Sequence, residues 1–426
     1  MKRLELFQSR LYQKAKEEPK RVFYSLHDKI CRADVLQEAW KSVRANHGSA
    51  GIDGVSIEDI EEYGTDRFLS KIREELANET YMVSKVKRIF IPKQNGKQRP
   101  LGIPTVRDRV VQQAVKSIIE PIFEADFQHF SYGYRPDRSA KDASEEIRKF
   151  LNYGYTNVVE IDVKGFFDHI NHERMLFLLS KRIADPYVLK LIREWLRAGI
   201  SFEGEVIYPE AGTPQGGVIS PLLANVYLNE MDTLWVKRKM DDRYGQNARM
   251  IRYADDIVIL TDRNPEYAMD MVERILSLLD LEISPEKSGI TTAKDGFDFL
   301  GFHFVRESSR MTGRDATYMY PSAKSIENFR GKIRAIVPRN HAFRKPMSKA
   351  VKQINAVIRG WSNYYKHTNA AATFAKLQKF VEWKLAKYYC SIHKIDRVSR
   401  KAGIYDTIHD YGLITLRRRI EYPRNA

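Results

Sequence analysis

Two adjacent carboxylates inside an apolar stretch restrict the fold of this chain more than any other feature. Asp255 and Asp256 lie within residues 249–260, between apolar runs that predict the two strands of a tight hairpin. Because anions are costly to bury, a turn that holds two of them requires a cation or full hydration. Magnesium prefers a few carboxylate oxygens and keeps several waters, which suits such a turn. A hydrated Asp-Asp turn is the alternative, since Asp is a common turn former.

A third carboxylate ends another short β-rich segment. Residues 157–163 are mostly strand formers, Asp162 lies near their end, and Lys164-Gly165 interrupts the pattern. Two-metal phosphoryl transfer requires carboxylates on rigid elements, with the two ions roughly 3.5–4 Å apart. Asp162 together with Asp255 and Asp256 would suffice, so the sequence predicts a site for phosphoryl transfer.

Six motifs, in order along the chain, resemble those of one enzyme family. The box from Tyr253 to Asp256, preceded by Asp162 in Asp-Val-Lys-Gly-Phe-Phe-Asp, resembles the palm active site of reverse transcriptases. The other motifs are similar to those of group II intron reverse transcriptase/maturases, and the resemblance covers about residues 45–390. These motifs are Ile91-Pro92-Lys93 with Arg99-Pro100-Leu101-Gly102-Ile103-Pro104, Ser131-Tyr132-Gly133-Tyr134-Arg135-Pro136, Gly212-Thr213-Pro214-Gln215-Gly216-Gly217, and Phe299-Leu300-Gly301-Phe302.

The resemblance implies an α+β fold with right-hand polymerase architecture: mixed α/β fingers, an antiparallel-sheet palm and an α-helical thumb. It also implies an RNA-directed DNA polymerase that copies RNA into cDNA and assists the splicing and mobility (retrohoming) of a group II intron. The expected domains are an N-terminal helical extension (1–45), fingers (46–155), palm (156–310), a thumb or maturase domain X (321–390) and a basic C-terminal tail, a possible DNA-binding remnant (391–426).

The same resemblance assigns roles to individual residues. Asp162, Asp255 and Asp256 are the expected ligands of two Mg2+ ions, for which Mn2+ is a substitute. The backbone carbonyl of Val163 is a further ligand, and Lys287 protonates the leaving pyrophosphate. The expected nucleotide-binding residues are Lys93, Arg99, Phe167 and Gln215. The expected template and primer contacts are Gly51, Arg135, Tyr253 and Gly301.

Several of these assignments have structural alternatives. Lys93 and Arg99, which flank a predicted Asn-Gly hairpin turn, are alternatively unpaired surface cations. Arg135 is equally suited to a structural salt bridge, and Phe167 to core packing instead of exclusion of the 2′-hydroxyl. Gln215 and Gly51 are alternatively ordinary turn residues. Asp168 is expected to cap a helix N-terminus and not to bind metal.

Positive charge is concentrated in the last quarter of the 426-residue chain. The whole sequence has a formal net charge of +16 and a pI near 9.5. Residues 321–426 contain 23 Lys and Arg against 6 Asp and Glu, whereas residues 1–320 contain 48 against 49. We expect this region to bind phosphates strongly and with steep salt dependence. A basic balance alone fits an acidic membrane surface or solubility equally well.

Cysteine content and hydropathy argue against other classes. Cys31 and Cys390 are the only cysteines, and no Cys/His cluster has the spacing of a zinc site. We therefore expect no cysteine-rich endonuclease domain and no DNA cleavage. The first residues lack a signal-peptide pattern, and no run approaches 18 apolar residues. We expect no membrane partner and a location in the cytoplasm or at the nucleoid.

The expected partners are an RNA template, a DNA or RNA primer, dNTPs, the group II intron RNA and target DNA. Two other functions would share this fold. One is a splicing maturase that only binds RNA, and the other is a freestanding, host-domesticated reverse transcriptase in defence or repair. A binding-only protein should tolerate loss of the carboxylates, so their presence favours catalysis. A viral-type RNA-dependent RNA polymerase is a weaker rival, because Phe167 would clash with the 2′-hydroxyl.

Overall fold

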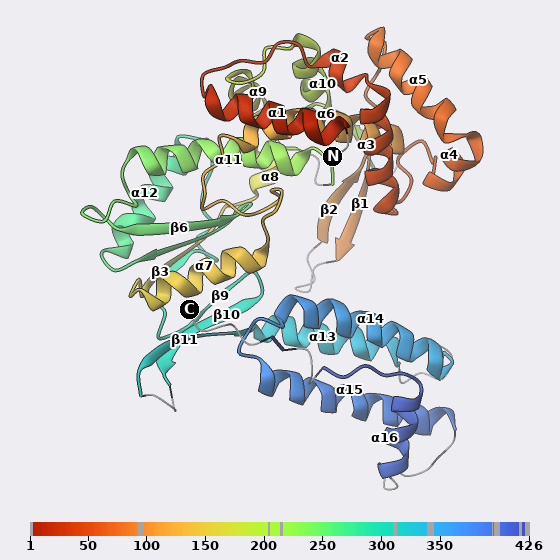
Figure 1. Cartoon of the computed structure of the whole chain (residues 1–426), viewed down its shortest axis with the longest axis vertical. Coiled ribbons are helices and arrows are strands. Elements are labelled where there is room, and N and C mark those ends of the chain that lie inside the picture. The colour runs from red at the N-terminus through yellow and green to blue at the C-terminus, as the bar shows by residue number, and fades with distance from the viewer. Residues whose placement is uncertain are drawn as a thin grey trace. The chain divides into compact units, whose positions relative to one another are not determined.

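A computed structural model describes residues 3–92, 98–202, 205–213, 216–309, 313–338, 345–393, 395, 401–416 and 420–421. The chain forms two compact units (Figure 1). The first consists of Met1–Ser139, Val159–Ile259 and Arg263–Gly289, and the second of Ala140–Val158, Leu260–Asp262 and Ile290–Ala426. The five domains expected from the sequence do not coincide with these two units, and the five-domain division stays a prediction.

Most of the first unit is helical. Its helices are α1 (Arg3–Glu17), α2 (His27–Ile30), α3 (Ala33–Ala45), α4 (Ile57–Tyr63), α5 (Thr65–Ala77), α6 (Val106–Glu124), α8 (Phe166–His169), α9 (His172–Ser180), α10 (Pro186–Leu196), α11 (Ser220–Lys237) and α12 (Pro265–Ser277). Helix α6 lies at the centre, because α1 and α3 both pack on it. The helical character predicted for residues 1–45 is confirmed.

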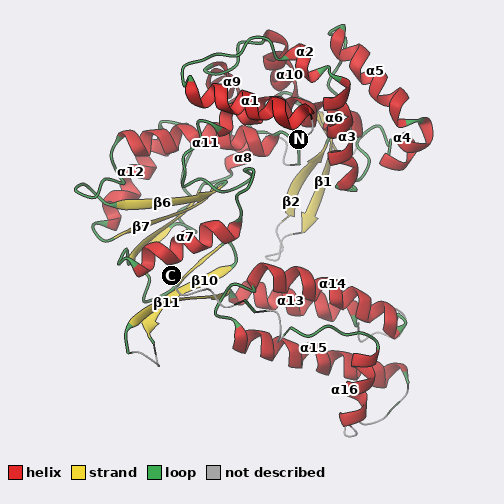
Figure 2. Ribbon diagram, viewed as in Figure 1, coloured by secondary structure: helices red, strands yellow, loops and turns green. Residues whose placement is uncertain are grey.

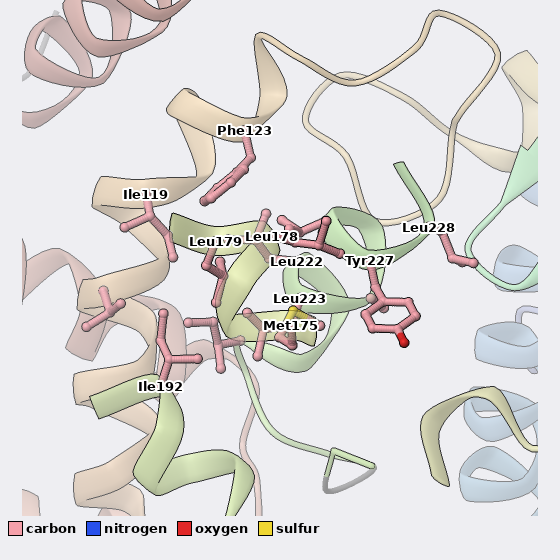
Figure 3. Packing of buried hydrophobic residues seen from close by; sticks show 14 of the residues in the cluster. Ile119, Phe123, Met175, Leu178, Leu179, Ile192, Leu222, Leu223, Tyr227 and Leu228 are labelled. Atoms are coloured by element: carbon pink, nitrogen blue, oxygen red, sulfur yellow. The ribbon is translucent and has the colours of Figure 1, made fainter. Parts of the chain in front are cut away.

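The core of this unit gathers apolar side chains from helices far apart in sequence. Figure 3 shows Ile119 and Phe123 of α6 near Leu179 of α9, and Leu222 and Leu223 of α11 close by. All of these side chains are buried. Burying a side chain of this size contributes roughly 1.5–3 kcal/mol relative to leaving it exposed, so the cluster is a rigid support for the strands beside it.

Two sheets belong to the first unit. The strands β1 (Val86–Pro92), β2 (Gln98–Ile103), β4 (Ile200–Phe202) and β5 (Glu205–Ile207) form one sheet in the order β2-β1-β4-β5. The predicted antiparallel pairing of β1 with β2 is confirmed, and its Asn-Gly turn lies outside the described residues. In the other sheet β6 (Ala248–Tyr253), β7 (Asp256–Thr261) and β3 (Asn157–Asp162) are neighbours in that order.

The second unit combines a small antiparallel sheet with long helices, which Figure 2 shows in yellow and red. Its sheet has the order β11-β10-β9. Its elements are α7 (Ala140–Asn152), β8 (Gly289–Thr292), β9 (Phe297–Phe299), β10 (Phe302–Ser308), β11 (Asp315–Pro321), α13 (Ala323–Ile336), α14 (Met347–Tyr365), α15 (Ala371–Ile392) and α16 (Lys401–Asp410).

The apolar residues that recur at helical spacing along α14 and α15 lie in the core. Val351, Ile354 and Ile358 of α14 are buried, as are Phe374 and Leu377 of α15. Lysines and arginines lie on the exposed sides of these two helices, including Lys352, Arg359, Lys376, Lys379 and Lys387. None of the helices in the described part of the chain combines the length and apolar character that a membrane span requires.

Candidate active site

The two adjacent carboxylates lie where the sequence places them, at the tip of a hairpin. Strand β6 ends at Tyr253, Ala254 and Asp255 form the turn, and Asp256 begins β7. Ala254 has a backbone φ of +57°, which is unusual for a residue other than glycine. A backbone in this region costs of order 1 kcal/mol or more, so the surrounding structure has to hold the turn in place.

A buried arginine holds this turn. The guanidinium of Arg252 donates through Nη1 to the carbonyl of Ala254 at 3.1 Å and to Oδ1 of Asn225 at 3.0 Å. Its Nε and Nη2 donate to the carboxylate of Asp232 on α11, at 2.9 and 2.5 Å. Neither side chain of the Arg252–Asp232 pair is exposed. The geometry of the carboxylate turn therefore depends on a buried ion pair with helix α11.

This network was not predicted from the sequence. The available signal was a charged residue, Arg252, among the apolar residues of a strand that we expected to be buried. Such a residue requires a buried partner of opposite charge. Nothing local to the hairpin identifies Asp232 as that partner, because it lies 20 residues away on a helix.

Residues 130–133 add a further support to the same turn. The amide of Tyr132 donates to the carbonyl of Arg252 at 2.8 Å, and the amide of Arg252 donates to the carbonyl of Phe130 at 2.9 Å. A Cβ added to Gly133 would lie 2.4 Å from the amide nitrogen of Ala254. Real Cβ atoms do not approach backbone atoms so closely, and therefore only glycine lets the backbones meet here.

We expect Gly133→Ala to displace the carboxylate turn and to lower the rate of nucleotide addition by about a hundredfold, since a shift near 1 Å at a catalytic group costs that much. Overpacking should destabilise the chain by about 1–3 kcal/mol. Single-turnover extension and denaturant unfolding measure the two effects. Gly331→Ala is the matched control, because a Cβ at Gly331 in α13 meets nothing within 4 Å. Equal activity of both variants would contradict the role of Gly133.

Asp162 lies at the end of β3, beside a segment from far along the chain. Its amide donates to Ser288 Oγ at 3.0 Å, and its carbonyl accepts from the amide of Ser284 at 2.8 Å. The ammonium of Lys287 donates to Asp162 Oδ2 at 2.8 Å. The structure therefore brings Lys287 to one of the predicted ligands, as expected for a residue of the same site.

Val163 continues this arrangement. It forms an antiparallel bridge with Ile283, and the flanking hydrogen bonds use the carbonyl of Asp162 and the amide of Lys164. The carbonyl of Val163 is not the acceptor in either of these two hydrogen bonds. Its predicted role as a backbone ligand is compatible with this geometry and stays a prediction.

The charges of these residues influence one another. The pKa of Asp256 is raised to about 6, first by partial desolvation and then by the negative charges of Asp255 and Asp162, against which Lys287 acts. The hydrogen bond to Asp162 raises the pKa of Lys287. Three carboxylates from two strands thus share one electrostatic environment.

This donor set fits a hard divalent cation, because carboxylate oxygens are the ligands that such ions prefer. A cation would also relieve the repulsion that raises the pKa of Asp256. Within the described residues, no group of three or more His, Cys, Asp or Glu side chains is close enough to form a complete metal site. The metal-ligand assignment of Asp162, Asp255 and Asp256 therefore stays a prediction that the electrostatics favour.

Phe167 lies against the loop that carries the predicted nucleotide-binding glutamine. Its carbonyl accepts from the amide of Thr213 at 2.8 Å, and the carbonyl of Ile170 accepts from the amide of Gly212 at 2.8 Å. The Phe167 side chain is half-buried and packs on Phe166, with ring centroids 5.2 Å apart. Gln215 and Lys93 lie outside the described residues, as does the side chain of Arg99.

The glycine on the other side of Gln215 is also tightly placed. A Cβ on Gly216 would lie 2.4 Å from the carbonyl oxygen of Gly102 in β2, and Gly216 has a φ of +120°. The loop therefore approaches β2, the strand that contains Arg99.

Asp168 does not cap a helix, contrary to our expectation. It lies within α8, and Asn171 caps α9 by accepting from the amide of Arg174 at 3.0 Å.

Arg135, predicted to contact the template, has partners within the protein. Its Nε donates to both oxygens of Glu124 at 3.0 Å, and its Nη1 donates to the carbonyls of Gln128 and Ser131 at 2.6 and 2.7 Å. Its side chain is only 4% exposed. The structure therefore favours the alternative of a structural salt bridge, and the template contact stays a prediction.

Two further predicted template contacts belong to the first unit. A Cβ on Gly51 would lie 2.6 Å from the Cα of Thr105, the N-cap residue of α6, so packing alone requires glycine there. Tyr253 is half-buried, and its ring centroid lies 6.3 Å from that of Tyr134, which is exposed. These two aromatic rings flank the carboxylate turn. The contact of Gly51 and Tyr253 with template remains a prediction.

Comparison with known proteins identifies the class. Residues 91–304 match the family described as reverse transcriptase (RNA-dependent DNA polymerase), and these residues include the carboxylate turn, Asp162 and Lys287. The chain belongs to this family and is a reverse transcriptase. Residues 326–404 match the group II intron, maturase-specific domain, which places the chain in the group II intron branch. Dependence on a divalent metal and nucleic-acid partners follow from this membership.

Individual relatives agree with that placement. Protein YkfC of Escherichia coli strain K12 is 32% identical over 343 residues, which cover 72% of this chain and 90% of that protein. The group II intron-encoded protein LtrA of Lactococcus lactis subsp. cremoris is 28% identical, over 90% of this chain and 77% of that protein. An uncharacterized 91 kDa protein in the cob intron of Schizosaccharomyces pombe is also 28% identical, over 90% of this chain and 56% of that protein.

Proposed function

We propose that this reverse transcriptase extends a DNA or RNA primer on an RNA template by two-metal nucleotidyl transfer, and that it assists the splicing and mobility of a group II intron. The observation that carries the proposal is the shared site of Asp162, Asp255, Asp256 and Lys287 within the reverse transcriptase region. Carboxylates from separate strands beside a cation suit phosphoryl transfer, which depends on positioning and charge stabilisation.

In the proposed reaction the primer 3′-oxygen forms a bond to the α-phosphorus of a deoxynucleoside triphosphate, and the bond to the pyrophosphate oxygen breaks. Asp162 and Asp255 would hold two Mg2+ ions, which Mn2+ could replace, and Asp256 would add charge or a further ligand. Bound magnesium supplies the charge that activates the attacking oxygen and stabilises the leaving one. Lys287 donates a proton to the pyrophosphate, in keeping with its place beside Asp162.

The nucleotide has its own proposed contacts. Lys93 and Arg99 hold its triphosphate, and Gln215 lies beneath its sugar. Support comes from the loop on either side of Gln215, since Thr213 bonds to Phe167 and Gly216 approaches β2. Phe167 then faces the 2′ position and excludes ribonucleotides by steric clash.

The proposal assigns the intron RNA to the second unit, with target DNA as a further partner. Support comes from the match of residues 326–404 to the maturase-specific domain and from the excess of Lys and Arg after residue 320. Lys376, Lys379 and Lys387 are exposed on α15. Such a surface binds phosphates without reading sequence.

Extension of a DNA primer on an RNA template, with dNTPs and Mg2+, tests the proposed function. We expect full-length cDNA, no product when the metal is chelated, and recovery when Mg2+ or Mn2+ is restored. A folded wild-type protein that binds RNA and never extends the primer would instead support a binding-only maturase. Intron-dependent splicing in the presence of the protein tests the second part of the proposal separately.

We expect Phe167→Val to admit ribonucleotides. A smaller side chain removes the clash with the 2′-hydroxyl, and the ratio of dNTP to rNTP incorporation efficiency should fall about tenfold or more. Single-nucleotide incorporation under steady-state conditions measures this ratio. Phe166→Leu is a matched control, since Phe166 is buried in the core. If the ratio is unchanged in Phe167→Val, the ring serves core packing only.

A further inference from the structure

The turn between β9 and β10, which contains Gly301, has an unusual backbone. Leu300 has a φ of +50° and Gly301 a φ of +80°. Two consecutive residues in this region leave their carbonyls outside the pairing of β9 with β10, which begins again at Phe302. Leucine is disfavoured there, and the conformation therefore requires support from neighbouring groups.

That support comes from the last two residues of helix α14. Tyr364 donates its hydroxyl to the carbonyl of Leu300 at 2.9 Å, and Tyr365 donates its hydroxyl to the carbonyl of Gly301 at 3.1 Å. The amide of Ser322 also donates to the Gly301 carbonyl, at 2.8 Å. Both residues of the turn thus have their carbonyls bonded to tyrosines of the same helix.

The rings of Tyr364 and Tyr365 also contact the turn region, because both pack against Phe302. Tyr364 stacks on the buried ring of Phe302, with centroids 5.0 Å apart and planes inclined by 12°. Tyr365 meets the same ring edge-on at 5.2 Å and is itself buried. Offset-stacked and edge-on pairs of this kind contribute beyond their buried area. Helix α14 and the turn are therefore held together through three aromatic residues.

We propose that Tyr364 and Tyr365 are positioning residues that couple helix α14 to the turn at Gly301, and through it to the primer end. The proposal rests on the proposed function and on the expectation from the sequence that Gly301 contacts the primer. Helix α14 exposes Lys352 and Arg359 on its outer side. A duplex bound by these cations would then hold the turn through the two hydroxyls, so that the primer end stays in place between additions.

Gly301 is adapted to the same contact. A Cβ at this position would lie 2.8 Å from the hydroxyl oxygen of Tyr365, in addition to the strain at a φ of +80°. The residue therefore allows the hydroxyl to reach the backbone carbonyl. A substitution at Gly301 should disturb the contact between the Tyr365 hydroxyl and the turn, and so should removal of that hydroxyl from helix α14.

The test compares wild type with Tyr364→Phe, Tyr365→Phe and the double variant, all of which keep their rings. Primer extension on an RNA template is measured with a heparin trap, so that each product reports one binding event. We expect the double variant to add about tenfold fewer nucleotides per event, because each lost hydrogen bond changes an equilibrium a few-fold. The rate constant of a single addition and the KM for dNTP should stay within about twofold.

Tyr388→Phe is the matched control. The Tyr388 hydroxyl also bonds to backbone in the second unit, donating to the Lys345 carbonyl at 2.9 Å and accepting from the Lys345 amide at 2.7 Å. Its loss should affect thermal stability as the other substitutions do, with unchanged processivity. An equal loss of processivity in Tyr388→Phe would overturn the proposal, because a general loss of stability would then explain both results.

A second measurement uses Gly301→Ala alone and combined with Tyr365→Phe. Removing the hydroxyl relieves the clash, so we expect the combined variant to lose less processivity than the two single effects predict together. Additive losses would overturn the coupling between the two residues. Normal extension by wild type with unchanged processivity in the double tyrosine variant would overturn the positioning role alone. No extension by wild type would overturn the proposed function and this role with it.

Discussion

Asp255→Asn should lower the single-turnover rate of nucleotide addition by about a thousandfold or more. The substitution keeps the size of the side chain and removes one charge from the group that stabilises the reacting phosphate, where a single missing contact already costs about 10²–10³. RNA binding should change less than about twofold, because the basic residues concentrated after residue 320 are untouched. Rapid-quench primer extension and a filter-binding assay measure the two quantities.

The three carboxylates should differ in a defined order. Asp162→Asn should match Asp255→Asn, and Asp256→Asn should lose less activity, since Asp256 would add charge or a further ligand while Asp162 and Asp255 hold the ions. Asp168→Asn is the control, because Asp168 lies six residues after Asp162, within α8, and is not among the expected metal ligands. A variant of Asp255 that keeps a tenth of the wild-type rate would contradict the assignment of this residue as a metal ligand.

Arg252→Met should destabilise the first unit by about 3–5 kcal/mol. The substitution leaves Asp232 buried without its partner, and an uncompensated buried charge carries a cost of that size. Asp232→Leu combined with Arg252→Met should restore much of this stability, because apolar residues often replace a buried ion pair at little cost. Denaturant unfolding followed by fluorescence gives the free energy of unfolding of each variant.

Activity should not recover with stability. Arg252 also donates to the carbonyl of Ala254, and no apolar side chain can hold the carboxylate turn in that way. We therefore expect the double variant to be well folded and still impaired in nucleotide addition by about a hundredfold. Arg274→Met is the control, since the Arg274–Asp270 pair is exposed and should contribute at most about 0.5 kcal/mol. Full activity in the folded double variant would show that Arg252 serves stability alone.

Much of the local structure could be predicted from the sequence. The apolar runs on either side of Asp255 and Asp256 predict the hairpin, and the spacing of apolar residues in α14 and α15 predicts two helices with buried stripes. Such patterns suffice because helix and strand place side chains with fixed periods, and burial selects apolar residues on one side. The carboxylates were found for the same reason, since charge is conspicuous in an apolar strand.

Assignments that depended on distant partners were less certain. Arg135 has a carboxylate partner on α6, Glu124, which its own motif does not indicate. Asp168 was expected to cap a helix, and the cap is Asn171 because α9 begins one turn later. Both cases involve a polar residue with several suitable partners, among which only the packed structure chooses.

By itself, the sequence determined the strands and helices, the carboxylates at the tip of a hairpin and the basic character of the last quarter, since each follows from neighbouring residues. Tertiary structure alone decided which distant groups meet. It brought Lys287 to Asp162 across 125 positions and Asp232 to Arg252, and it set the two tyrosines of α14 on the turn at Gly301. The reason is that burial removes water from these polar groups, and each can then be satisfied only by whichever partner the packing of the core places beside it.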